Sequence, residues 1–147
     1  MTPALEVAHL SKTFAARRGP FGLLGQSVVH AVDDVSFSVG AARTLALVGE
    51  SGCGKTTIGR MVVRLTAPSA GRIAVEGEDF TRLKGEALRR KRQRVQMVFQ
   101  DPFACLNARM TGEAIVAEPL VNFGLGDAAA RRRRVCRLFD QVGLPQT

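Results

Sequence analysis

The sequence predicts an α/β fold in which an antiparallel, β-rich flank accompanies a sheet built around a strand, a loop and a helix. Residues 44–48 form a short apolar run, as in a parallel strand that is buried on both faces. Glycines follow at once, and apolar residues then recur at helical spacing. Earlier in the chain, Val35, Phe37 and Val39 alternate with serines, which predicts a strand with one solvated face. This order of elements suits an α/β sheet with an antiparallel flank.

The other elements are predicted from the same patterns, and no internal repeat is found. Further strands are expected at 4–10, 71–75 and 95–99. A helix is expected at 58–65, where apolar residues recur at helical spacing, and it should end before Pro68. A second, strongly basic helix is expected at 83–92. From residue 111 onward, two helices are expected, with a break around 122–126. Glycines and a proline indicate a loop from about residue 17 to residue 27.

Length and composition favour one folded domain. The chain has 147 residues, of which 46% are hydrophobic, and none of its apolar runs approaches the roughly 18 to 20 residues of a membrane-spanning helix. The first residues, MTPALEVAHLSKTF, lack the basic start and long apolar core of a signal peptide. Three cysteines without metal-ligand spacing, Cys53, Cys105 and Cys136, favour reduced thiols in a cytosolic protein.

The net charge of +8 raises the question of a nucleic-acid partner. Basic residues cluster at 89–94 and at 131–134. Neither cluster has interleaved aromatic residues, and the chain has no Tyr or Trp for base stacking. Solvated helix faces are therefore the favoured interpretation, with nucleic-acid binding as the alternative.

The glycine loop carries the chemistry. Gly49, Gly54, Lys55 and Thr56 fit G-x-x-x-x-G-K-[ST], the phosphate-binding loop, between a predicted strand and a predicted helix. Glycines let the backbone approach phosphate oxygens, and the helix start adds a positive dipole end. Lys55 is expected to reach the β- and γ-phosphates and the Thr56 hydroxyl to coordinate Mg²⁺. The expected phosphate contacts are Gly49, Glu50, Ser51, Gly52, Cys53, Gly54, Lys55, Thr56 and Thr57. For Cys53, a small side chain that only fills space in the loop is favoured over a reactive thiol.

Two segments, the first of which contains this motif, resemble a known protein family. "VGESGCGKTT" and, about forty residues later, "VQMVFQDPFACLNARMT" resemble the ATP-binding cassette transporters, and most of all the ATP-binding subunits of oligopeptide and dipeptide importers. In that family a glutamine senses Mg²⁺ and the attacking water and links the site to the membrane subunits; Gln100 occupies that place. Phe14, in "LSKTF", matches the aromatic residue that stacks on adenine, and a core phenylalanine is the alternative.

The resemblance implies a P-loop nucleoside triphosphate hydrolase fold with Mg²⁺-ATP as its ligand. Residues 1–100 would be the N-terminal part of the nucleotide-binding core, and 101–147 the start of the helical subdomain. Lys55 and Gln100 would serve catalysis, and Thr56 and Gln100 the metal. Permease subunits and a second ATP-binding subunit would be the partners, with no nucleic acid and no membrane span of its own. The expected place is the cytoplasm, at the inner face of the plasma membrane.

The sequence also departs from this family. We find no LSGGQ-type signature and no second acidic strand, and both His9 and His30 precede the phosphate loop, so neither matches the switch histidine. The resemblance therefore predicts an N-terminal fragment without its general base, slow in ATP turnover. A nucleotide-binding module that never hydrolyses and a basic nucleic-acid-binding protein stay as alternatives. The transported solute, peptide, nickel or other, is left open.

Overall fold

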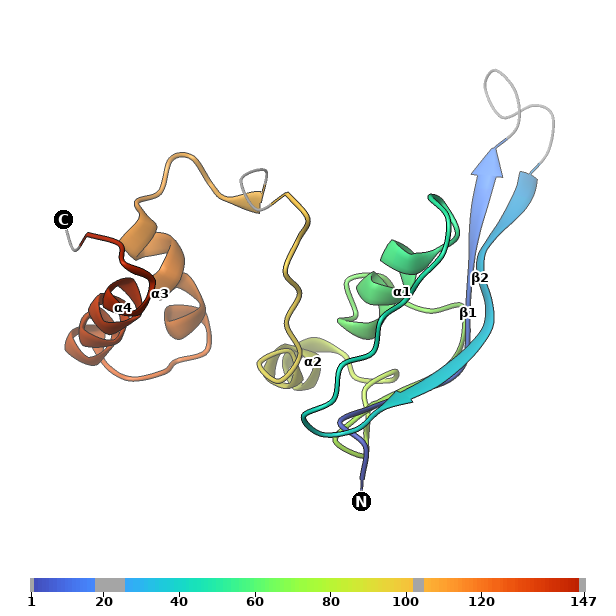
Figure 1. The fold of residues 1–147 in the computed structure, drawn as a ribbon, viewed down its shortest axis with the longest axis horizontal. Helices are drawn as coiled ribbons and strands as arrows, with labels where there is room; N and C mark the ends of the chain where they lie inside the picture. The colour runs from blue at the N-terminus through green and yellow to red at the C-terminus, as the bar shows by residue number, and fades with distance from the viewer. Residues whose placement is uncertain (1, 18–25, 102–104, 146–147) are drawn as a thin grey trace. The chain divides into compact units, whose positions relative to one another are not determined.

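The structure, a computed structural model, describes residues 2–17, 26–101 and 105–145. These residues fall into two compact units, Met1–Met97 and Val98–Thr147 (Figure 1). In the described residues, no helix has both the length and the apolar character needed to cross a membrane. The loop predicted at 17–27 lies mostly outside the described residues.

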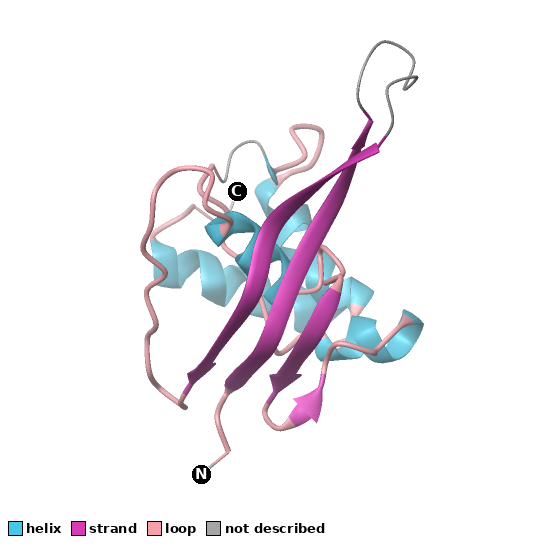
Figure 2. Ribbon diagram, turned by 90° about the vertical axis from the view of Figure 1, so that its right-hand side faces the viewer, coloured by secondary structure: helices cyan, strands magenta, loops and turns pink. Residues whose placement is uncertain are grey.

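The first unit is built on a four-stranded antiparallel sheet. Its strands are β1 (Leu5–Arg17), β2 (Gln26–Val39), β3 (Ala70–Val75) and β4 (Glu78–Asp79). They lie in the order β2-β1-β3-β4 (Figure 2). The pairing of β1 with β3 ends where Ser11 meets Ala70, whereas β1 and β2 stay paired to Arg17 and Gln26. Beyond β3 the two long strands therefore continue as a two-stranded ribbon. The predicted antiparallel flank is confirmed.

Irregular pairing bends the two long strands. The register of β1 against β2 shifts three times between Val7 and Thr13. His9 and Asp34 both have positive φ, 51° and 46°, and the His9 Nδ1 lies 2.7 Å from the Asp34 Oδ1. The hydroxyl oxygens of Ser36, which is exposed, and Ser11, which is half-buried, accept the backbone N–H groups of His9 and Asp34. These serine hydroxyls satisfy the donors that the bulges remove from the ladder.

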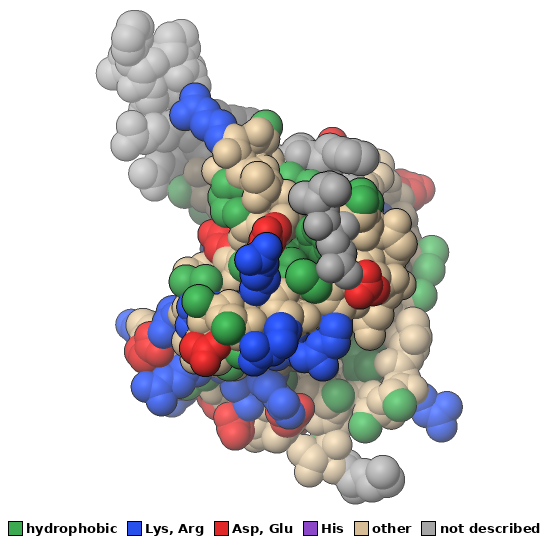
Figure 3. Space-filling view, turned by 90° about the vertical axis from the view of Figure 1, so that its left-hand side faces the viewer, with side chains coloured by type: hydrophobic (Ala, Val, Ile, Leu, Met, Phe, Trp, Pro, Cys, Tyr) green, Lys and Arg blue, Asp and Glu red, His purple; other side chains and the backbone are tan. Residues whose placement is uncertain are grey.

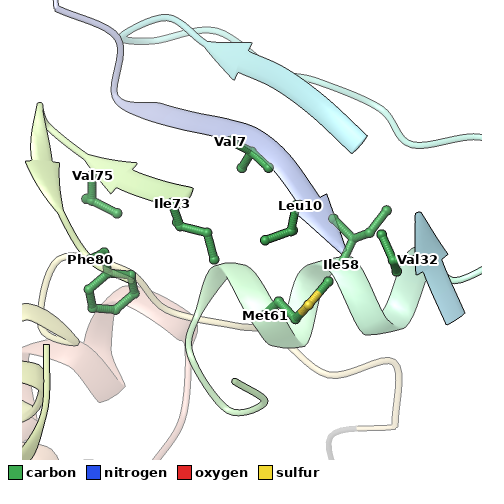
Figure 4. Packing of buried hydrophobic residues seen from close by; sticks show 8 residues of the cluster. All are labelled: Val7, Leu10, Val32, Ile58, Met61, Ile73, Val75 and Phe80. Atoms are coloured by element: carbon green, nitrogen blue, oxygen red, sulfur yellow. The ribbon is translucent and has the colours of Figure 1, made fainter. Parts of the chain in front are cut away.

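The core of this unit lies where α1 (Lys55–Val62) packs on the sheet. The buried cluster draws on three strands, the helix and the residue after β4 (Figure 4): Val7, Leu10, Val32, Ile58, Met61, Ile73, Val75 and Phe80. Ile58 and Met61 point from the helix into this cluster, which confirms the helical spacing read from the sequence. The helix ends earlier than expected, because Arg64 takes a left-handed conformation with φ of 58°, and Leu65 is exposed.

The basic helix α2 (Gly85–Lys91) confirms the prediction at 83–92. Ion pairs tie it to β4 and tie the residues after it to the turn between β3 and β4. Lys91 Nζ lies 2.6 Å from Glu78 Oε2, and Arg94 Nη2 lies 2.8 Å from Glu76 Oε1. The guanidinium group of Arg94 holds the pKa of Glu76 below its ordinary value.

Two predicted strands are wrong. In the structure, residues 44–48 and 95–99 are irregular, and no strand pairing among the described residues includes them. Leu45, Leu47 and Val48 are exposed rather than buried on two faces. An apolar run indicates that a segment can be buried, but the segment forms a strand only where a neighbouring strand completes its ladder of hydrogen bonds. The four described strands pair only with one another, and none of them pairs with these segments.

In its described residues the second unit contains two α-helices, as predicted, with a break around 122–126. They are α3 (Gly112–Asn122) and α4 (Ala128–Val142). Each begins with a side-chain cap: the Thr111 Oγ1 accepts the N–H of Ala114, and the Asp127 Oδ1 accepts the N–H of Ala130 at 2.7 Å. Such caps satisfy backbone donors that a helix leaves unpaired in its first turn.

Candidate functional site

The glycine loop at 49–54 runs directly into the N-terminus of α1. Gly52 and Gly54 have φ of 85° and 96°, a region that L-residues with a side chain enter only under strain. A Cβ atom on Gly54 would collide with the carbonyl oxygen of Ala31 and lie 3.2 Å from the Val32 Cγ2. The end of the loop is therefore seated directly against the backbone of β2.

The interior of the loop is narrow on one side and open on the other. A Cβ atom on Gly49 would lie 2.7 Å from the Cys53 Sγ, so the cysteine sulfur takes the space beside that glycine. At Gly52 a Cβ atom would meet nothing within 4 Å. The backbone at Gly52 can thus approach a ligand without an intervening side chain.

Lys55 reaches back across the loop that precedes it. Its Nζ donates to the carbonyl oxygens of Gly49 at 2.7 Å and Glu50 at 2.6 Å, and lies 3.4 Å from the Cys53 Sγ. These three partners hold the ammonium group, and with it a positive charge, against the first residues of the loop, on the side that the Cys53 sulfur occupies.

The first turn of α1 adds backbone donors and a partial positive charge. The Ile58 N–H bonds to the Gly54 carbonyl at 2.9 Å, and the N–H groups of the three residues before it have no partner within the helix. Gly54 is the N-cap residue and provides no side-chain cap, and the first turn contains no acidic residue. Thr56 is exposed in this turn. Helix starts of this kind attract phosphate groups.

Phe14 lies on the ribbon formed by β1 and β2. It pairs with Val29, three residues along β2 from the Val32 that adjoins Gly54, so it stands on the order of 10 Å farther out than the seat of the loop. Its side chain is 44% exposed and does not belong to the core cluster. The alternative interpretation, a core phenylalanine, does not hold.

Gln100 is an exposed residue of the second unit, whereas the loop, Thr56 and Phe14 belong to the first. Among the described residues, no group of three or more His, Cys, Asp or Glu side chains could hold a metal ion. One feature of the site was missed by sequence reasoning, the ammonium group of Lys12, which lies over the Phe14 ring.

The family model described as ABC transporter matches residues 32–147. The "Probable peptide ABC transporter ATP-binding protein" of Sinorhizobium fredii is 44% identical over 140 residues, which cover 95% of this chain and 39% of the relative. The oligopeptide transport ATP-binding protein AppF of Bacillus subtilis is also 44% identical, over 95% of this chain and 43% of its own length. The chain thus spans about two fifths of the length of these relatives.

A solved structure supports the fold. A dimeric ATP-binding cassette in a post-hydrolysis state, bound to ADP and Pi, matches 97% of this chain and 58% of its own chain with a TM-score of 0.76. The two sequences are 20% identical, so this likeness concerns the fold alone. The predicted P-loop fold of an ABC ATPase is therefore confirmed, and with the family model covering most of its length the chain belongs to the ABC transporter family.

Proposed function

We propose that this chain is the nucleotide-binding part of an ATPase subunit that energises an importer of peptide-type solutes. The observation that carries the proposal is the glycine loop, which combines the Lys55 ammonium, the start of α1 and a stretch of backbone that is open at Gly52. Glycines, a lysine and free N–H groups of a helix start are the donor set that a polyphosphate requires.

Each residue of the site has a role in this proposal. Backbone N–H groups from Gly52 to Thr57 bind the phosphates, and Lys55 exchanges its hydrogen bonds with loop carbonyl oxygens for bonds to phosphate oxygens. Phe14, exposed on the ribbon, stacks on the adenine ring. When bound, ATP supplies the phosphoanhydride bond whose cleavage drives transport.

The metal of this proposal is Mg²⁺, held by Thr56 and Gln100 together with phosphate oxygens and water. Mg²⁺ keeps several water molecules and takes few protein ligands when it accompanies a nucleotide. A threonine hydroxyl and a glutamine amide oxygen suit this mode, which needs no cluster of carboxylates.

The partners follow from the relatives' names. The Sinorhizobium fredii relative is named for a peptide transporter and the Bacillus subtilis relative for oligopeptide transport, which supports a peptide-type solute. The solved cassette is dimeric, which supports a second ATP-binding subunit. We place the subunit in the cytoplasm, on permease subunits at the inner face of the plasma membrane.

Nucleic-acid binding is less well supported than this proposal. In the basic cluster at 89–94, Arg89 and Arg90 pair with Glu86, and Lys91 and Arg94 pair with other carboxylates. Figure 3 shows acidic side chains among the Lys and Arg side chains on the face that it draws. These ion pairs reduce the positive charge that a phosphate backbone would encounter.

Titration of a fluorescent ATP analogue in the presence of Mg²⁺ tests the proposal. Lys55→Ala should weaken binding at least about tenfold, because a charge-assisted hydrogen bond contributes about 1.5 to 3 kcal/mol. Lys84→Ala, which removes an exposed lysine just before α2, is the matched control and should bind like the parent. Equal affinities of the parent and Lys55→Ala would reject this function for the loop.

A further inference from the structure

Lys12 contacts the aromatic ring that the proposed function assigns to adenine. Its Nζ lies 5.0 Å from the centroid of the Phe14 ring, within the range of a cation–π interaction. The same Nζ donates a hydrogen bond of 2.8 Å to the carbonyl oxygen of Ala67, in the turn after α1. The ammonium group is thus fixed between a ring face and a backbone acceptor.

The backbone around Lys12 is itself held in place. Ser69 forms three hydrogen bonds with the residues on either side of the lysine: its N–H donates to the Ser11 carbonyl, and its Oγ contacts the Thr13 N–H and the Thr13 Oγ1. These bonds fasten the middle of β1 to the segment that follows the phosphate-loop helix. The ammonium group is therefore presented to Phe14 from a rigid support.

The charge of Lys12 is not neutralised by an acidic side chain. Within the described part of the chain, none of the ion pairs involves Lys12. The ring and the Ala67 carbonyl are its partners, and the side chain is half-buried. If Lys12 served only to join β1 to the segment after α1, its ammonium group would not have to lie over the exposed Phe14 ring.

We propose that Lys12 is a positioning residue that prepares Phe14 for a purine base. The ammonium group occupies one face of the ring and leaves the other face to the ligand. Because it draws π-electron density toward itself, it weakens the repulsion between the electron-rich faces of the phenyl ring and the base. This inference rests on the proposed ATP binding and adds a determinant of base affinity, as distinct from phosphate affinity.

The test compares two probes on three proteins. The dissociation constants of a non-hydrolysable ATP analogue and of inorganic tripolyphosphate, both with Mg²⁺, are measured for the parent, Lys12→Met and Lys12→Arg. We expect Lys12→Met to weaken the ATP analogue about two- to fivefold relative to tripolyphosphate, as the usual strength of an exposed cation–π contact implies. Lys12→Arg, which keeps the cation, should restore the ratio of the two constants. Lys84→Met is the matched control.

A second pair of variants tests whether Lys12 acts through the ring. In a Phe14→Leu background, Lys12→Met should leave the ratio of the two dissociation constants unchanged, because no ring is left to polarise. An equal loss for both probes, or tighter binding of the ATP analogue by Lys12→Met, would overturn the inference while leaving the proposed function intact. A parent protein that binds neither probe would overturn the proposed function itself.

Discussion

The Lys55 ammonium group is bound at 2.7 Å to the carbonyl oxygen of Gly49, the first residue of the glycine motif. The lysine stands next to the last residue of the motif, so this bond joins the two ends of the loop. The loop therefore depends on backbone conformations that a side chain would disturb, most of all at its last glycine, Gly54.

Gly54→Ala should destabilise the protein more than Gly52→Ala. Both glycines have positive φ, so each alanine carries about 1 to 2 kcal/mol of backbone strain. At Gly54 the new Cβ also meets the Ala31 carbonyl, and the shift that this forces adds about 1 to 3 kcal/mol. The chain has no Trp or Tyr, so urea unfolding is followed by far-UV circular dichroism. Equal losses of unfolding free energy would show that the loop is not seated on β2.

The sequence predicted the elements whose signals are local. Ile58 and Met61 fall on one helix face, and both are buried in the structure. The alternation at 35–39 likewise gave a strand with exposed serines, within β2. The runs at 44–48 and 95–99 were predicted wrongly, because their apolar character is local whereas pairing depends on a distant neighbour.

The same distinction applies to the site. The glycine motif is contiguous, so a loop that leads into a helix could be predicted from the spacing of Gly49, Gly54 and Lys55, whereas the bonds of Lys55 to the carbonyl oxygens of Gly49 and Glu50 were not predicted. The position of Lys12 over Phe14 depends on the bonds to Ala67 and Ser69, more than fifty residues away along the chain. No pattern in the sequence encodes that contact, although a lysine two residues before an aromatic residue on one strand is compatible with it.

The ion pair between Glu76 and Arg94 makes stability depend on pH. The hydrogen bond from Arg94 lowers the Glu76 pKa below its ordinary value of 4.5, against a smaller opposing effect of burial, with help from the charges of Arg94 and Lys91. Because the folded pKa lies below the unfolded one, the stabilisation is complete above about pH 4.5 and is lost as pH falls through the folded pKa.

Glu76→Gln should therefore unfold at lower urea than the parent near neutral pH, and the difference should shrink as pH falls below 4.5. The effect is small, since the pair is exposed. Glu118→Gln, on an exposed position of α3, is the control and should show no such dependence. A difference that stays constant from neutral to acid pH would show that the Arg94 pair does not cause it.

The apolar segment at 44–48 should limit the solubility of this 147-residue chain. Val48 is 92% exposed and stands in backbone that no described strand pairs. Unpaired N–H and C=O groups next to apolar side chains form a template on which another chain can add a strand. Val48→Lys should oppose this addition, because a charge at the centre of a growing edge must be desolvated or repelled by its copy.

Val142→Lys provides the matched control for that prediction. Val142 is also exposed, at 69%, but it ends α4, whose backbone bonds within the helix. The two variants change charge and hydrophobicity equally, so a general gain in net charge would raise solubility to the same extent in both. We expect Val48→Lys alone to raise the concentration at which light scattering first detects aggregates. Equal gains would assign the effect to net charge, and no gain in either would mean that the segment at 44–48 does not take part in aggregation.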